Sequence, residues 1–117
     1  MRPERLYLTD IVEAAEAITT FVSGSARESF VGDDLLRSAV LHKLTVIGEA
    51  AARLPPTVRE RFPELPWADI VAFRNIAVHS YFAVDWEIVW VTATLDAPRL
   101  RQQVADILQL LEKDDAT

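Results

Sequence analysis

The sequence has no cysteine, only three glycines and only two histidines. Without cysteine, disulfide frameworks, thiolate metal sites and thiol nucleophiles are excluded, and a reducing cytoplasm is the expected compartment. Long apolar runs are missing too. The strongest uncharged run, IVWVTATL, is far shorter than the roughly 20 residues of a membrane helix, and the start MRPERLYLTD lacks the apolar segment of a signal peptide. We therefore expect a soluble protein that neither enters a membrane nor is exported.

The length of 117 residues, half of them apolar, suits one hydrophobic core, so residues 1–117 are expected to form a single helical domain. The net charge of -6 argues against a protein that coats nucleic acid through phosphate contacts. The charge is uneven, however, because residues 42–81 carry five basic and four acidic side chains whereas both flanking parts are acidic. The middle of the chain could therefore still form a local positive cleft that binds a phosphate.

Helical periodicity predicts two long helices in the first half of the chain. The first covers about residues 4–23, and the second begins at Asp33 or Asp34 as a cap and ends at the prolines 55 and 56. Gly24 and Gly32 mark the break between them. The two apolar stripes consist of Tyr7, Ile11, Ala14, Ile18 and Phe21, and of Val40, Leu44, Ile47, Ala51 and Leu54.

The second half continues with a connector at residues 55–66 that holds one short helical turn. A third helix is predicted from Pro66 to Ser80, and a fourth begins near Asp85 and is interrupted by Pro98 before the last helical stretch. The β-branched run IVWVTATL leaves a strand as an alternative, although no second strand is available to pair with it. Four main helices plus a short helical turn predict an all-α, antiparallel up-and-down helical bundle.

Gly48 stands inside the second predicted helix, where glycine costs about 1 kcal/mol relative to alanine. We therefore expect another backbone to pass close to Gly48 and Ala51, either in this chain or in a partner.

An arginine precedes a histidine by five residues twice, in RSAVLH (Arg37 and His42) and in RNIAVHSYF (Arg74 and His79). A step of five turns a helix by about 140°, so the spacing alone does not place both side chains on one face. The first pair lies in the middle of a helix. We interpret it as structural, with Arg37 directed to solvent and His42 beside the apolar stripe.

The second pair has polar neighbours that favour a functional site. Asn75 lies one helical turn before His79, where its amide can orient the imidazole, and the long side chain of Arg74 can reach the same side. Tyr81 follows near the predicted helix end, where side chains can face a cleft. The structural alternative is that His79 caps the helix C-terminus, where positive charge is favourable, and that Tyr81 belongs to the core.

The available residue types favour metal-free chemistry. Two histidines on different helices, without acidic residues at ligand spacing, give too few ligands for a metal, and no serine stands in a nucleophile elbow. RNA cleavage needs less, because the ribose 2′-hydroxyl is the nucleophile. The protein must move protons near neutral pH and stabilise the phosphorane charge, and histidine and arginine suit these tasks. One such histidine per chain is one short of an acid and base pair, which a two-fold dimer would complete.

The segment RNIAVHSYF resembles the R-x4-H-x-Y signature of the HepT-like toxins, the branch of the HEPN superfamily paired with minimal nucleotidyltransferase (MNT) antitoxins. The resemblance extends to IGEAAARLP in the second predicted helix, to FPELPW before the third and to VDWEIVW after the motif. It covers the chain from about residue 30 onward.

This resemblance implies a homodimer whose motif helices face each other across the two-fold axis, and a metal-independent endoribonuclease that acts as a bacterial toxin on RNA without a cofactor. By position, Arg74 and His79 would be catalytic and Asn75 would support His79. Tyr81 would be the tyrosine that the MNT antitoxin modifies with AMP. The Arg37 pair matches no family motif, because Leu44 stands where a tyrosine would be needed.

Two other interpretations remain open. A non-catalytic helical module would use the same residues to bind a nucleotide or to dock a nucleotidyltransferase. A plain helical dimer would use these polar residues for stability alone.

Overall fold

The computed structural model describes residues 3–76 and 84–116, and every regular element within them is helical. The elements are α1 (Pro3–Val22), α2 (Arg27–Val31), α3 (Asp34–Arg53), α4 (Pro56–Arg61), α5 (Trp67–Ala72), the 3-10 turn η1 (Phe73–Asn75), α7 (Trp86–Val91), the π-helical turn η3 (Thr92–Asp96) and α8 (Ala97–Ala116). None of the helices in these two described stretches combines the length and the apolar content that crossing a bilayer requires.

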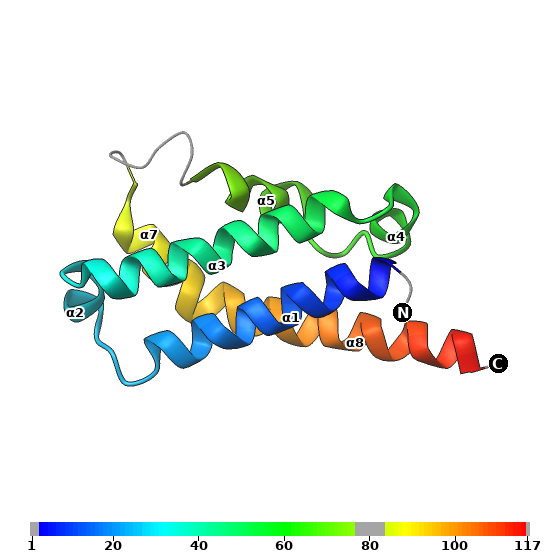
Figure 1. The fold of residues 1–117 in the computed structure, drawn as a ribbon, viewed down its shortest axis with the longest axis horizontal. Coiled ribbons are helices and arrows are strands. Elements are labelled where there is room, and N and C mark those ends of the chain that lie inside the picture. Colours follow the sequence, from blue (N-terminus) through cyan, green and yellow to red (C-terminus); the bar gives the residue numbers. More distant parts are fainter. Residues whose placement is uncertain (1–2, 77–83, 117) are drawn as a thin grey trace.

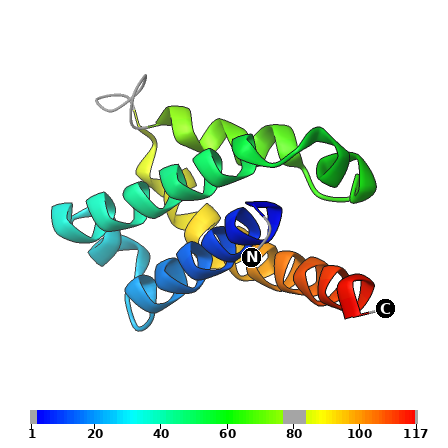
Figure 2. The ribbon, with the colours of Figure 1, turned by 45° about the vertical axis from the view of Figure 1, so that its right-hand side comes forward.

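The helices α1, α3, α5 and α8 run alternately in opposite directions, as Figure 1 shows. The long helix α3 packs against α1 on one side and against α5 on the other, and α1 also packs against α8. Figure 2 shows the same order of layers from a second direction. No comparable contact joins α5 to α8 among the described residues, so the fourth side of the bundle is open. This arrangement confirms the predicted all-α, antiparallel up-and-down bundle.

The core lies between α1, α3 and α8, and the predicted stripe of α3 is buried along its whole length. The predicted stripe of α1 is partly wrong, because Phe21 is exposed and Tyr7 is only half-buried. The buried face of α1 recurs in alternating steps of three and four at Leu8, Ile11, Ala15, Ile18 and Val22. Periodicity thus predicted the helix correctly, but it assigned the wrong first and last residues to the buried face.

The break between the two long helices holds the short helix α2, which the sequence did not predict. Phe30 of α2 is fully buried, and its ring lies 5.3 Å from the ring of Trp90, measured between centroids. Gly24 has a positive φ of 79°, which lets the chain turn after α1. Asp33 caps α3 as predicted, since its carboxylate accepts a hydrogen bond of 3.0 Å from the backbone nitrogen of Leu36.

The connector forms one short helix, α4, as predicted. The indole nitrogen of Trp67 then donates a hydrogen bond of 2.9 Å to the carbonyl oxygen of Phe62. This bond closes the loop before α5 and buries the first residue of that helix. It fixes the direction in which α5 enters the bundle.

The segment IVWVTATL is helical, so the strand alternative is wrong. Asp85 caps α7 through bonds of 3.0 and 3.3 Å from the backbone nitrogens of Glu87 and Ile88, as expected for a helix that begins there. The interruption expected at Pro98 takes the form of the π-helical turn η3 directly before α8. Because proline has no N–H to donate, the hydrogen-bond pattern of the helix changes just before Pro98.

Candidate active site

Arg74 and Asn75 lie in the 3-10 turn η1, which follows α5 without a break. The predicted third helix is α-helical over Trp67–Ala72, winds more tightly through η1 and is α-helical again at Ile76, and its predicted residues 77–80 lie outside the described residues. Asn75 is exposed and Arg74 is half-buried. His79 and Tyr81 lie outside the described residues, as does the expected approach of His79 to Arg74 and Asn75.

The backbone of Arg74 rests directly on Gly48 of α3. A Cβ atom built on Gly48 would overlap the backbone nitrogen of Arg74, and it would lie 3.0 Å from the carbonyl oxygen of Val71. Real side chains do not tolerate such contacts, so glycine is required here for α3 and η1 to meet. The expected close approach is confirmed, and it occurs within this chain.

The side chain of Arg74 is engaged differently from its backbone. Among residues 3–76 and 84–116, no hydrogen bond, ion pair or ring contact joins the Arg74 guanidinium to another group. The contact with Gly48 therefore sets the position of the Arg74 backbone. The charge of its side chain has no structural partner in the described part of the chain. A guanidinium that no structural contact engages is available to stabilise the negative charge of a phosphorane.

The Arg37 pair has the opposite character. The Arg37 guanidinium lies 4.7 Å above the centre of the Trp86 ring and donates a hydrogen bond of 3.0 Å to the carbonyl oxygen of Val31. The expectation that Arg37 points into solvent is wrong, because only 25% of its side chain is exposed. Its structural role is supported, since it ties α3 to the start of α7. His42 is exposed on α3.

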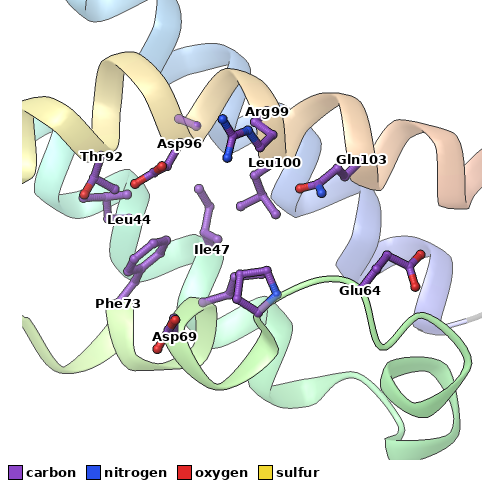
Figure 3. Close-up of a pocket in the computed structure, with 13 residues that line it drawn as sticks. Leu44, Ile47, Glu64, Asp69, Phe73, Thr92, Asp96, Arg99, Leu100 and Gln103 are labelled. Atoms are coloured by element: carbon purple, nitrogen blue, oxygen red, sulfur yellow. The ribbon is translucent and has the colours of Figure 1, made fainter.

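A groove of about 350 Å³ fills the open side between α5 and α8, as Figure 3 shows. Its lining residues are Leu44, Ile47, Glu64, Pro66, Asp69, Ile70, Phe73, Thr92, Asp96, Ala97, Arg99, Leu100 and Gln103. The floor is apolar, and the polar rim carries three carboxylates and one guanidinium. Neither Arg74 nor Asn75 lines it. An acidic rim repels phosphate, so this groove does not suit an RNA backbone.

Sequence reasoning missed this groove, although a signal for one wall was present. Thr92, Asp96, Arg99 and Gln103 follow one another in steps of four and three, which places them along one face of the helix. The opposite wall could not be anticipated, because it depends on how far the short helix α5 stands from α8.

No metal-ligand cluster is evident in the described portion of the chain, where groups of three or more His, Asp or Glu side chains do not gather around one point. The described residues thus provide the guanidinium of Arg74, the amide of Asn75 and a groove with an acidic rim.

A sequence model of the family described as Ribonuclease HepT-like matches residues 11–107. The chain belongs to this HepT-like family. The matched region contains the whole of RNIAVHSYF, so the resemblance stated on the motif is confirmed over most of the chain. Membership places the chain in a family of ribonucleases with a helical fold.

Relatives of the HepT-like chain carry names of the same class. A candidate RNase of Caldanaerobacter subterraneus subsp. tengcongensis is 38% identical over 93% of this chain and 97% of the relative. A candidate RNase of Methanocaldococcus jannaschii is 33% identical, with coverage of 88% and 94%. A candidate ribonuclease HepT of Thermococcus cleftensis is 36% identical, with coverage of 86% and 91%. No solved structure matches the chain significantly.

Proposed function

We propose that the chain is a metal-independent endoribonuclease, the toxin of a HepT/MNT toxin–antitoxin pair, with Arg74 and His79 as its catalytic residues. The observation that supports the proposal most directly is the environment of Arg74. Gly48 seats its backbone, and no described group engages its guanidinium. Membership in a family of ribonucleases supplies the reaction class.

In the proposed reaction the ribose 2′-oxygen attacks the adjacent phosphorus atom. One imidazole accepts the 2′-hydroxyl proton, the bond from phosphorus to the 5′-oxygen breaks, and a protonated imidazole gives a proton to that leaving oxygen. The products are a 2′,3′-cyclic phosphate and a 5′-hydroxyl. Arg74 stabilises the extra negative charge of the phosphorane between these events.

Two imidazoles are needed for this sequence, and RNIAVHSYF supplies one. A homodimer that brings two motif segments to one cleft provides the base from one protomer and the acid from its partner. Asn75 would hold the His79 ring in the tautomer that the reaction needs.

Neutralisation by a cognate MNT antitoxin completes the proposal. The phenol oxygen of Tyr81 attacks the α-phosphate of ATP, pyrophosphate leaves, and AMP stays on the tyrosine. Tyr81 stands two residues from His79. The phosphate added to Tyr81 would therefore place negative charge where the RNA phosphate must enter, and would exclude the RNA from the site.

The direct test is RNA cleavage by the purified protein in the presence of EDTA, compared between the wild-type chain, His79→Ala and His42→Ala. We expect the wild-type chain and His42→Ala to cut and His79→Ala to be inactive with an unchanged circular dichroism spectrum. His42 is the matched control because it is the second histidine of the chain and is exposed on α3.

Equal cleavage by His79→Ala and the wild-type chain would remove His79 from the mechanism. A wild-type chain that never cuts RNA, yet binds AMP or ATP in a calorimeter, would instead favour the non-catalytic nucleotide-binding module.

A further inference from the structure

The groove between α5 and α8 combines an apolar floor with polar groups along one wall. Leu44, Ile47 and Leu100 form much of the floor, and their side chains are buried between the helices. The volume of about 350 Å³ lies within the range of protein sites that hold small organic groups. A hollow of this size and polarity suits a flat, uncharged ring better than a charged phosphate.

The π-helical turn η3 builds part of the polar wall. Thr92 and Asp96, the first and last residues of η3, both line the groove. Such turns are rare in helices and are frequently found at functional sites. The Thr92 hydroxyl is used inside the helix, because it donates a hydrogen bond of 3.0 Å to the carbonyl oxygen of Ile88. The polar group that η3 offers to a ligand is therefore the carboxylate of Asp96.

Asp96 and Arg99 place opposite charges side by side at the groove rim. They are three residues apart, a spacing that makes side chains neighbours on a helix, and Figure 3 shows them next to each other. Both are exposed. Within residues 3–76 and 84–116, neither one forms an ion pair or a hydrogen bond with another side chain. The pair is thus available to a ligand that offers donors to the carboxylate and an acceptor to the guanidinium.

Guanine matches this pair better than the other RNA bases. A carboxylate only accepts hydrogen bonds, and guanine presents two adjacent donors, N1–H and N2–H, that one carboxylate can bind together. The neighbouring O6 of guanine is an acceptor that suits arginine. Adenine, cytosine and uracil each lack such a pair of adjacent donors. A guanine edge therefore satisfies both the Asp96 carboxylate and the Arg99 guanidinium.

The opposite wall of the groove supplies a surface for the face of a base. Phe73 lines the groove from η1 and is half-buried. Aromatic rings are the usual partners of unpaired RNA bases, whose edges are then read by hydrogen bonds. The groove thus contains an aromatic ring from one wall and a charged pair from the other, as Figure 3 shows.

The groove also lies next to the proposed catalytic arginine. Phe73 directly precedes Arg74, and Ile47 of the floor directly precedes Gly48, on which the Arg74 backbone rests. An RNA phosphate held by Arg74 would therefore bring a neighbouring base to the groove. The acidic rim keeps phosphates out of the groove, whereas a base carries no charge and can enter.

We propose that this groove is a guanine-specific subsite for the RNA substrate. The Asp96 carboxylate accepts hydrogen bonds from N1–H and N2–H of the base, the Arg99 guanidinium donates to O6, and the Phe73 ring packs on the face of the base. The proposal rests on the proposed function, and it adds that the RNA is cut beside an unpaired guanosine. Asp96 and Arg99 are then the residues that determine specificity.

The test is the binding of a short, fluorescently labelled single strand, measured by fluorescence anisotropy. The strand carries one guanine among uracils, and its sugars are 2′-deoxy so that it cannot be cut. We expect the wild-type chain to bind it at least about tenfold more tightly than the strand with adenine in that place, which is the usual discrimination of a base read by two hydrogen bonds. Hypoxanthine, which lacks the 2-amino group, should give an intermediate affinity.

Asp96→Asn separates the reading of the base from general electrostatics. Loss of a negative charge strengthens the binding of nucleic acids in general. We expect the opposite for the guanine strand, about tenfold weaker binding, because an amide cannot accept both donors. The adenine strand should bind no more weakly than before. Asp106→Asn is the matched control, since it removes the same charge from α8 at a carboxylate that accepts from Gln102 and does not line the groove. It should keep the guanine preference.

Arg99→Gln should lose the preference as well, and circular dichroism verifies that each variant is folded. Wild-type protein that binds the strands equally or binds none of them overturns the subsite, as does a folded Asp96→Asn variant with an unchanged guanine preference. RNA cleavage is measured separately, on ribose strands with and without guanine. A guanine preference in binding without any cleavage would contradict the proposed function and leave the subsite standing. Cleavage at equal rates with and without guanine would contradict the subsite alone.

Discussion

Arg37 and Arg74 have the same spacing to a histidine and opposite surroundings. Arg37 is held by its side chain, which stacks on Trp86 and donates to the Val31 carbonyl oxygen. Arg74 is held by its backbone, which rests on Gly48, and its guanidinium has no hydrogen bond or ion pair within the described chain. A side chain committed to packing is not free for chemistry, whereas the Arg74 guanidinium stays available to a substrate while Gly48 sets the position of its backbone.

Of the substitutions that test this comparison, removal of the Arg74 guanidinium is expected to have the largest effect on activity. We expect Arg74→Ala to lower single-turnover RNA cleavage by about a hundred- to a thousandfold, which is the usual loss when one stabilising donor is removed from an active site. The melting temperature should change little, because no hydrogen bond, ion pair or ring contact in the described chain involves the Arg74 guanidinium. Cleavage at the wild-type rate by a folded Arg74→Ala variant would show that the charge is not used.

The seat of Arg74 can be broken without touching its charge. Gly48→Val should lower the free energy of unfolding by about 3 kcal/mol, the upper end of the cost of overpacking a core, because its Cβ would overlap backbone atoms of η1. Cleavage should fall as well, even where chemical denaturation shows the variant to be folded.

Gly32→Val is the matched control for that variant. A Cβ on Gly32 would meet only the Glu28 carbonyl oxygen, at 3.5 Å, which is an ordinary contact. Similar losses of stability in both variants would mean that the contact between α3 and η1 is not special.

Arg37→Ala tests the other half of the comparison through stability. The lost stacking on Trp86 and the lost hydrogen bond should together cost about 1–3 kcal/mol in the free energy of unfolding. Cleavage per folded molecule should stay within a few-fold of the wild-type value, because Arg37 packs on Trp86 at the start of α7 and is not one of the proposed catalytic residues. A hundredfold loss of cleavage in folded protein would give the two arginines the same role.

The smallest effect is expected at Asp34, and it distinguishes whether an ion pair or the stacking on Trp86 holds Arg37 in place. Asp34 lies 3.5 Å from the Arg37 guanidinium but is 83% exposed. Asp34→Asn should therefore change the free energy of unfolding by less than about 0.5 kcal/mol, as is usual for exposed ion pairs. A loss as large as that of Arg37→Ala would transfer the anchoring role from Trp86 to this ion pair.

Much of the bundle follows from periodicity and helix-terminating residues. The stripe of α3, the cap at Asp33 and the short helix between the prolines were all predicted, because each depends on neighbours in the sequence. Helix α2 was missed, since its five residues are too few for a periodic signal and Phe30 is buried through tertiary contacts, among them the one with Trp90.

For the candidate site, the sequence pointed to Gly48 as a close approach and left open whether the other backbone was in this chain or in a partner. Only the fold identifies Arg74 as the neighbour. The groove depends on the open side between α5 and α8, which no local pattern encodes. The roles of Arg74, His79, Asn75 and Tyr81, and the single-domain assignment, stay predictions.

The central claim is that the RNA supplies its own nucleophile and the protein supplies Arg74 and His79. It is tested most directly by the products of cleavage in EDTA, with RNA and with the same strand lacking one 2′-hydroxyl at the cut site. The account predicts a 2′,3′-cyclic phosphate and a 5′-hydroxyl from the RNA, and no cut at the altered position. Cleavage that stops on chelation, or that proceeds equally without the 2′-hydroxyl, would contradict it.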